Sequence, residues 1–138
     1  MWNNYKSMPG LLKFLTAHAL ACIVFLIGSV IPHNSFSING RQVTYLEWWG
    51  AGAGAYASVI GVILPISAWL LLNRSCHARG FYLCSMIVGL ILSYLLFQQV
   101  WESDTGYGYA AVGTIIVAIL TWYLYKKESV RHYFVSNH

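Results

Sequence analysis

Four long apolar runs, separated by short polar segments, restrict the fold of this chain more than any other feature. They cover approximately residues 14–32, 50–72, 80–99 and 109–125. A helix needs about 20 residues to cross the ~30 Å hydrocarbon core of a bilayer, so each run is long enough to span one. The sequence therefore predicts an all-α integral membrane protein. Its four transmembrane helices form one bundle, and residues 1–138 make a single domain.

Charged residues are too few for a fold surrounded by water. They make up 9% of the chain and hydrophobic residues make up 58%, whereas about 25% of a soluble domain is charged. In a bilayer, apolar side chains face lipid and helices satisfy their own backbone hydrogen bonds. Membrane lipid is therefore the expected surrounding of most of the molecule. The first run is too long for a signal-peptide core, and we expect it to be retained as a helix.

Basic residues are distributed unevenly between the two ends of the predicted bundle. One end holds Lys6, Lys13, Arg74, Arg79, Lys126, Lys127 and Arg131, and the other holds Arg41 with three acidic residues, Glu47, Glu102 and Asp104. Lysine and arginine accumulate in cytoplasmic loops. We therefore expect both termini in the cytoplasm. A compact chain without a targeting segment favours a bacterial inner membrane, and an organellar membrane is the alternative. This distribution suits lipid headgroups and argues against a nucleic-acid partner.

The loop over residues 33–49 carries a hairpin signal. Asn39 and Gly40 lie between two short segments, 35–38 and 41–44. Both residues tolerate the positive φ that a type I′ turn requires. The sequence predicts a short β-hairpin on the extracytoplasmic side of the membrane. Because an isolated two-stranded hairpin is marginally stable, we expect it to rest on the helix ends through Phe36, Ile38 and Val43.

Small residues recur at four-residue spacing in the predicted helices. The positions that we expect at helix contacts are Gly50, Gly54, Ser58, Gly61, Ser85, Gly89, Ser93 and Gly113. Small side chains let helix backbones approach closely, which favours association inside a membrane. We interpret them mainly as packing positions within one chain. A homo-oligomer contact and the lining of a lumen remain the alternatives.

The predicted outer ends of helices two to four gather polar and aromatic side chains, which we name the outer mouth. Its members are Arg41, Glu47, Trp48, Trp49, Gln98, Gln99, Trp101, Glu102 and Asp104. Acidic groups beside aromatic rings suit a cationic ligand or a basic partner, through charge attraction and cation–π contacts. Tyr56, Ser58 and Thr114 would line a cavity entered from this side. The alternative is a solvent-exposed loop that binds no ligand, with aromatic residues that anchor the helix ends at the lipid boundary.

Other residues provide weak signals for chemistry. Pro65 lies inside the second run, where proline removes a backbone donor and can act as a hinge, although prolines are also ordinary in membrane helices. His18, Cys22, Cys76, His77 and Cys84 have no metal-binding spacing, so we expect neither a metal nor another cofactor. No run has a charged residue at its centre, and no catalytic arrangement is apparent.

Abundant packing surface without recognisable chemistry favours a non-enzymatic binding protein. The leading hypothesis is a small inner-membrane protein that binds another integral membrane protein, as an immunity, assembly or regulatory subunit. The alternative is a homo-oligomeric channel or small-solute transporter, with Pro65 and the glycines shaping the pathway. A membrane enzyme ranks third, because an acid–base pair is missing.

Overall fold

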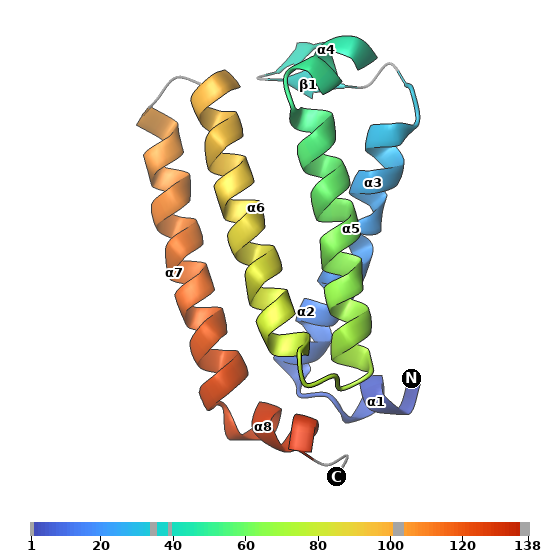
Figure 1. The fold of residues 1–138 in the computed structure, drawn as a ribbon, viewed down its shortest axis with the longest axis vertical. Helices are drawn as coiled ribbons and strands as arrows, with labels where there is room; N and C mark the ends of the chain where they lie inside the picture. Colours follow the sequence, from blue (N-terminus) through green and yellow to red (C-terminus); the bar gives the residue numbers. More distant parts are fainter. Residues whose placement is uncertain (1, 34–35, 39, 101–103, 136–138) are drawn as a thin grey trace.

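A computed structural model describes residues 2–33, 36–38, 40–100 and 104–135 of the chain. Its helices are α1 (Trp2–Ser7), α2 (Gly10–Ala21), α3 (Ile23–Val30), α4 (Tyr45–Gly50), α5 (Ala53–Leu72), α6 (Ala78–Val100), α7 (Asp104–Lys126) and α8 (Glu128–Val135). The strands are β1 (Ser37–Ile38) and β2 (Arg41–Gln42). Figure 1 shows β1 and α4 at one end of the molecule, the hairpin end, and α1 and α8 at the opposite end, the terminal end.

Among the described residues, four helical segments are long and apolar enough to cross a membrane: Gly10–Val30, Ala53–Leu72, Ala78–Leu96 and Gly108–Lys126. The predictions of a mainly helical chain, four apolar helices and a small two-stranded sheet are therefore confirmed. The first segment comprises both α2 and α3. They meet at Cys22, whose carbonyl accepts from the N–H of Phe25, a tighter pattern than that of a regular α-helix.

The second apolar run differs from the prediction at its start. Residue 50 was expected to begin a transmembrane helix, but Gly50 ends α4, and α5 begins at Ala53. Between them, Gly52 adopts a φ of +78°, a conformation that glycine reaches readily because it has no Cβ. The chain therefore turns sharply before α5. By contrast, α5 continues without interruption through Pro65, the position predicted as a possible hinge.

The helices lie side by side with α5 in the middle. It packs against α2, α3 and α6, and α6 packs against α7. In Figure 1, α3 lies on the side of α5 away from α6, and α2 passes behind α5. The fully buried side chains come mainly from the terminal half of the molecule, and those of Leu12, Ala68, Leu71, Tyr82, Leu124 and Val130 have no exposed surface. The main hydrophobic core therefore lies near the terminal end.

Three glycines lie where neighbouring helices approach closely. A Cβ at Gly61 would lie 2.5 Å from the backbone nitrogen of Leu26, and a Cβ at Gly89 would lie 2.9 Å from Cδ1 of Ile60. At Gly113, a Cβ would overlap the side chain of Leu90. These glycines lie at the α3–α5, α5–α6 and α6–α7 contacts. Each of them therefore packs against a neighbouring helix of the same chain.

The serines predicted at helix contacts have different environments. Ser58 lies 2.9 Å from the hydroxyl of Ser29, and Ser67 lies 3.0 Å from the hydroxyl of Ser85, so each pair joins neighbouring helices. The hydroxyl of Ser93 instead donates to the carbonyl of Leu90 in its own helix. Interhelical hydroxyl pairs are favourable where no water competes for the bond. They add polar contacts on both sides of α5.

Two short helices cover the terminal end of α5. The Nδ2 of Asn4 in α1 donates to the carbonyl of Leu72, and the hydroxyl of Tyr133 in α8 donates to the carbonyl of Leu71. Both carbonyls belong to the last turn of α5, where the regular i+4 backbone donors are missing. The Leu71 carbonyl also accepts from the N–H of Arg74. The guanidinium of Arg74 lies 4.5 Å from the ring centroid of Tyr133. Burial raises the pKa of Tyr133, and the nearby Arg74 partly opposes that rise.

Candidate functional site at the hairpin end

A two-residue turn and a helix cap organise the hairpin end. In the hairpin, Ser37 pairs with Gln42 and Ile38 with Arg41, and the turn uses Gly40 at a φ of +76°. The N–H of Val43 then donates to the carbonyl of Phe36, which extends the hairpin by one bond. Phe36 is 4% exposed. The hairpin therefore rests on the molecule through a buried aromatic ring.

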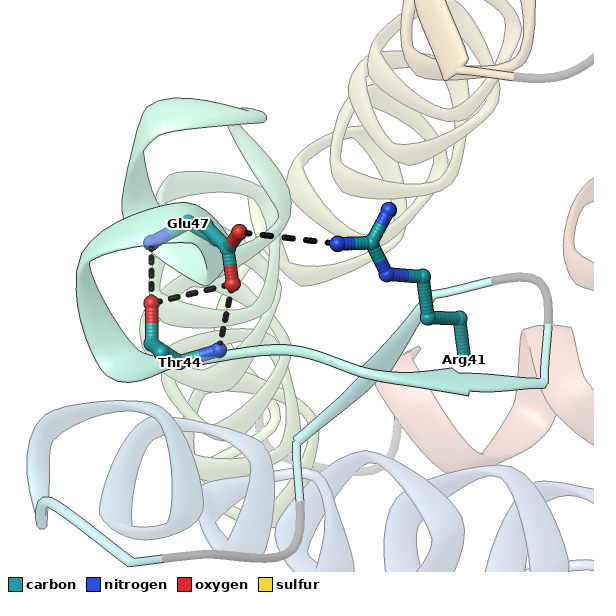
Figure 2. Close-up of polar contacts among 3 residues, drawn as sticks. All are labelled: Arg41, Thr44 and Glu47. Carbon is teal, nitrogen blue, oxygen red and sulfur yellow. Dashed lines mark hydrogen bonds and ion pairs between the residues drawn. The ribbon is translucent and has the colours of Figure 1, made fainter.

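Thr44 and Glu47 form a capping box at the start of α4. The N–H of Glu47 donates to the hydroxyl oxygen of Thr44 over 3.2 Å, and the N–H of Thr44 donates to Oε2 of Glu47 over 2.8 Å. Figure 2 shows these bonds, with the guanidinium of Arg41 4.0 Å from the other carboxylate oxygen. Bonds from the backbone and side chain of Thr44, with a smaller contribution from Arg41, lower the pKa of Glu47.

Aromatic rings pack together beneath the hairpin. The ring of Phe36 stacks on His33 with centroids 4.0 Å apart and on Trp48 with centroids 5.2 Å apart. Trp49 lies edge-on to Tyr45, and its indole N–H donates to the carbonyl of Ser29. The two tryptophans are half-buried. They are thus part of the packing between α4 and the helices below.

Gly50 and Gly54 have roles that the small-residue pattern alone does not predict. No described atom lies within 4 Å of the position that a Cβ would take at Gly50. At Gly54, the nearest atoms are the rings of Trp49 and Trp48, with the closest 2.7 Å from that position. Gly54 therefore makes room for the tryptophans of α4. It does not bring two long helices together.

A cavity of about 460 Å³ lies between α3 and α5 below these rings. Its α3 wall includes Val24, Phe25 and Gly28, and Trp48 and Phe36 contribute near the hairpin end. The α5 wall consists of Ala53, Tyr56, Ala57 and Ile60. Pockets of this size with mostly apolar and aromatic walls are typical of small-molecule and cofactor sites. The cavity is therefore a candidate ligand site.

The structure brings together some of the predicted outer-mouth residues. Arg41, Glu47, Trp48 and Trp49 lie within β2 and α4. Gln98, Gln99, Trp101, Glu102 and Asp104 lie outside the residues whose side chains are described.

Of the three residues expected to line a cavity, Tyr56 does so. Ser58 bonds to Ser29, and the Thr114 hydroxyl donates to the carbonyl of Ala110 in its own helix.

Sequence reasoning missed His33 as part of this site, and it missed that Glu47, Trp48 and Trp49 belong to a separate short helix, α4. The pattern Thr44-x-x-Glu47 was a readable signal for α4, because a threonine followed three residues later by glutamate typically starts a helix. His33 had no such signal. Among the described residues, no group of three or more His, Cys, Asp or Glu side chains is placed to hold a metal ion.

Comparisons with protein-family models, with curated proteins and with solved structures found no match for this chain.

Proposed function

We propose that this chain is a small polytopic membrane protein that acts without catalysis by binding another integral membrane protein. Immunity, assembly and accessory subunits are the roles that such binding would serve. The proposal places the four apolar helices in a bacterial inner membrane with both termini in the cytoplasm. Two observations support this placement. The chain has four apolar helices, and α1 and α8 lie at the same end of the molecule (Figure 1).

The observation that carries the proposal is the exposed face of α7. Its main neighbours are α6 along one side and α8 at its end. Val112, Ile115, Ile116 and Ile119 are 50–59% exposed. Their i, i+3, i+4, i+7 spacing places them on one stripe of the helix.

This stripe suits a partner helix for a second reason. Valine and isoleucine are stiff at χ1, so they lose little side-chain freedom when another helix packs against them. Residues of the same chain already pack against the small-residue positions: Leu26 against Gly61, Ile60 against Gly89 and Leu90 against Gly113. A partner would therefore contact the branched apolar stripe of α7, not the small-residue positions.

Co-purification tests the proposal. The tagged chain, extracted from its native membrane in a mild detergent, should retain a membrane protein in fixed stoichiometry. Replacing Ile115 and Ile119 by alanine removes apolar contact with the partner. It should lower the recovery of that protein about tenfold, which corresponds to a loss of ~1.4 kcal/mol of binding free energy. The matched control replaces Ile23 and Ile27 of α3, which are similarly exposed and four residues apart. It should leave recovery unchanged.

Two outcomes would contradict this function. One is a monodisperse chain that retains no partner under any mild extraction. The other is solute or ion flux in liposomes that contain only this protein, which would support the homo-oligomeric channel or transporter instead.

A further inference from the structure

Two arginines near the connection between α5 and α6 have different surroundings. The guanidinium of Arg74 lies 4.5 Å from the ring centroid of Tyr133, and its Nη2 donates to the hydroxyl of Ser7 over 2.8 Å. Arg74 also adopts a φ of +52°, a conformation that is uncommon for residues other than glycine. Arg74 therefore joins this connection to α1 and α8 and serves the fold.

Arg79, in the first turn of α6, has no comparable bond. Its guanidinium carbon lies 5.0 Å from the ring centroid of Tyr125 in α7 and 5.1 Å from that of Phe134 in α8. Both distances are within the ~6 Å limit of a cation–π contact. Within the described part of the chain, the Arg79 side chain makes no hydrogen bond and no ion pair. Two rings thus hold a half-buried positive charge that lacks an acceptor.

The two rings orient the guanidinium without using its donors. A cation–π contact involves the face of the guanidinium, whereas its five N–H groups lie in the plane and form a fixed fork. Phe134 is 9% exposed, so the packing of α8 fixes this ring. The hydroxyl of Tyr125 would lie 3.8 Å from a Cβ at Gly80, which places it beside the first turn of α6. The fork is therefore preorganised for an oxyanion.

The terminal end supplies little negative charge to Arg79. Among the described residues of this end, Glu128 is the only acid, and its carboxylate lies 3.7 Å from Nε2 of His132. Six further basic residues belong to the same end: Lys6, Lys13, Arg74, Lys126, Lys127 and Arg131. Because these charges repel cations and attract anions, we expect the acceptor for Arg79 to be an external anion.

Arg79 and Tyr125 lie at the boundary of the apolar spans. The spans that contain them are Ala78–Leu96 and Gly108–Lys126, so each residue is one position from the terminal end of its span. In a membrane, this is the depth at which the hydrocarbon core meets the headgroups. A phospholipid supplies a phosphate there, and arginine binds phosphate through two parallel hydrogen bonds.

We propose that Arg79 binds the phosphate of an anionic glycerophospholipid in the leaflet at the terminal end, while Tyr125 and Phe134 hold its guanidinium in place. The inference rests on the membrane placement of the proposed function and not on the partner protein. A headgroup with net negative charge is preferred over a zwitterionic one, because the surrounding basic residues repel an ammonium group. Basic pockets between membrane helices bind anionic headgroups in this way.

Native mass spectrometry of the full chain measures this binding. The chain is purified in a mild detergent and incubated with mixed micelles that contain equal amounts of phosphatidylglycerol and phosphatidylethanolamine. We expect one phosphatidylglycerol per chain to remain bound, retained roughly fivefold better than phosphatidylethanolamine, the effect of about one charge near a lipid surface. An excess of inorganic phosphate in the incubation should not displace it, because free phosphate gains no contact with the apolar helices.

Substitution of Arg79 tests the proposed contact. Arg79→Gln removes the charge and should lower retention of phosphatidylglycerol about tenfold or more, the usual value of a hydrogen bond to a charged group. Arg79→Lys keeps the charge without the planar fork, so its retention should be intermediate. The matched control is Arg131→Gln, which removes one charge from an exposed residue of α8. It should change retention less than about threefold, since salt screens exposed charges.

Tyr125→Leu tests whether the ring positions the guanidinium. This variant keeps Arg79 and should lower retention about 2- to 5-fold, the usual value of one cation–π contact at an exposed site. If the ring acts through Arg79, the two effects are not additive. The double variant, Tyr125→Leu with Arg79→Gln, should then retain as much lipid as Arg79→Gln alone.

Four results would overturn the inference. They are an unmodified chain that retains phosphatidylglycerol no better than phosphatidylethanolamine, an Arg79→Gln chain that retains as much as the unmodified one, an Arg131→Gln chain that loses as much as Arg79→Gln, and displacement of the lipid by inorganic phosphate. Thermal unfolding checks each variant, and Arg79→Lys replaces Arg79→Gln if the latter does not fold. Recovery of the partner protein by the Arg79→Gln chain should be unchanged, so the two proposals fail separately.

Discussion

The carboxylate of Glu47 accepts from the backbone N–H and the hydroxyl of Thr44, and Arg41 lies at the limit of an ion pair with it. Through these bonds one side chain fixes the first turn of α4. That turn positions Trp48 and Trp49 over Gly54. The positions of these two tryptophans at the hairpin end of the cavity therefore depend on the ionisation of Glu47. A protonated carboxyl is a weaker acceptor than a carboxylate.

We predict that the order of α4 depends on pH in one direction. The pKa of Glu47 lies below its ordinary value of 4.5. The stabilisation from its charged form is therefore complete above the unfolded pKa and is lost as pH falls through the lowered folded value.

Hydrogen exchange of residues 45–50 measures this. Protection should be constant between about pH 7 and about pH 5, and then decline below about pH 4. A Glu47→Gln chain should show weaker protection without the acid transition. Equal pH dependence in both chains would contradict this role of Glu47.

At the residue scale the sequence supports some predictions and not others. The hairpin turn at Gly40 was predictable because few residues adopt positive φ, and the capping box has a recognisable spacing. Asn39, the other predicted turn residue, lies outside the described residues. The bond from Trp49 to the carbonyl of Ser29 joins residues 20 positions apart. Such a contact depends on how α3 and α4 pack, which local sequence patterns do not specify.

Close helix contacts at the element scale depend on glycines whose neighbours differ. Gly61 lies against the backbone of Leu26, whereas Gly89 and Gly113 lie against the side chains of Ile60 and Leu90. A side chain can rotate away from an added methyl group, but a helix backbone moves only with its helix. Of the three, Gly61 is therefore the position least tolerant of substitution.

We predict that Gly61→Ala lowers the free energy of unfolding by about 1–3 kcal/mol, the usual cost of overpacking. The matched control is Gly108→Ala in α7, where no described atom lies within 4 Å of the new Cβ. That variant should be neutral or more stable by up to ~1 kcal/mol, since alanine favours helices over glycine. Unfolding by a denaturing detergent in mixed micelles measures both. Equal effects would contradict the close α3–α5 contact.

The sequence predicted the long helices better than the short ones. Each candidate span is a predominantly apolar stretch of 19–21 residues, a signal that few other structures produce. By contrast, α1, α4 and α8 have six to eight residues each. Isolated helices of that length are marginal in water, so their stability comes from packing, such as the bond from Tyr133 to Leu71. Local sequence contains little information about such packing.

At the scale of the whole molecule, the described chain ends lie at the same end (Figure 1). The proposed topology, with an even number of membrane crossings, requires this arrangement. The seven basic residues of the terminal end and Arg41 at the hairpin end agree with the positive-inside rule.

We predict that reporters fused to residue 1 and to residue 138 are both active in the cytoplasm, and that a reporter inserted after Gly40 is active only outside it. A cytoplasmic reporter enzyme and a periplasmic one, compared at each position, measure this. Reporters on opposite sides for the two termini would contradict the proposed topology.

The position of the main hydrophobic core has a consequence for how the molecule opens. Local unfolding free energies follow the density of buried contacts, and the fully buried side chains concentrate near the terminal end. The helices should therefore stay joined longest near the terminal end when the molecule unfolds, and the slowest hydrogen exchange is expected in the helical turns that contain these buried side chains.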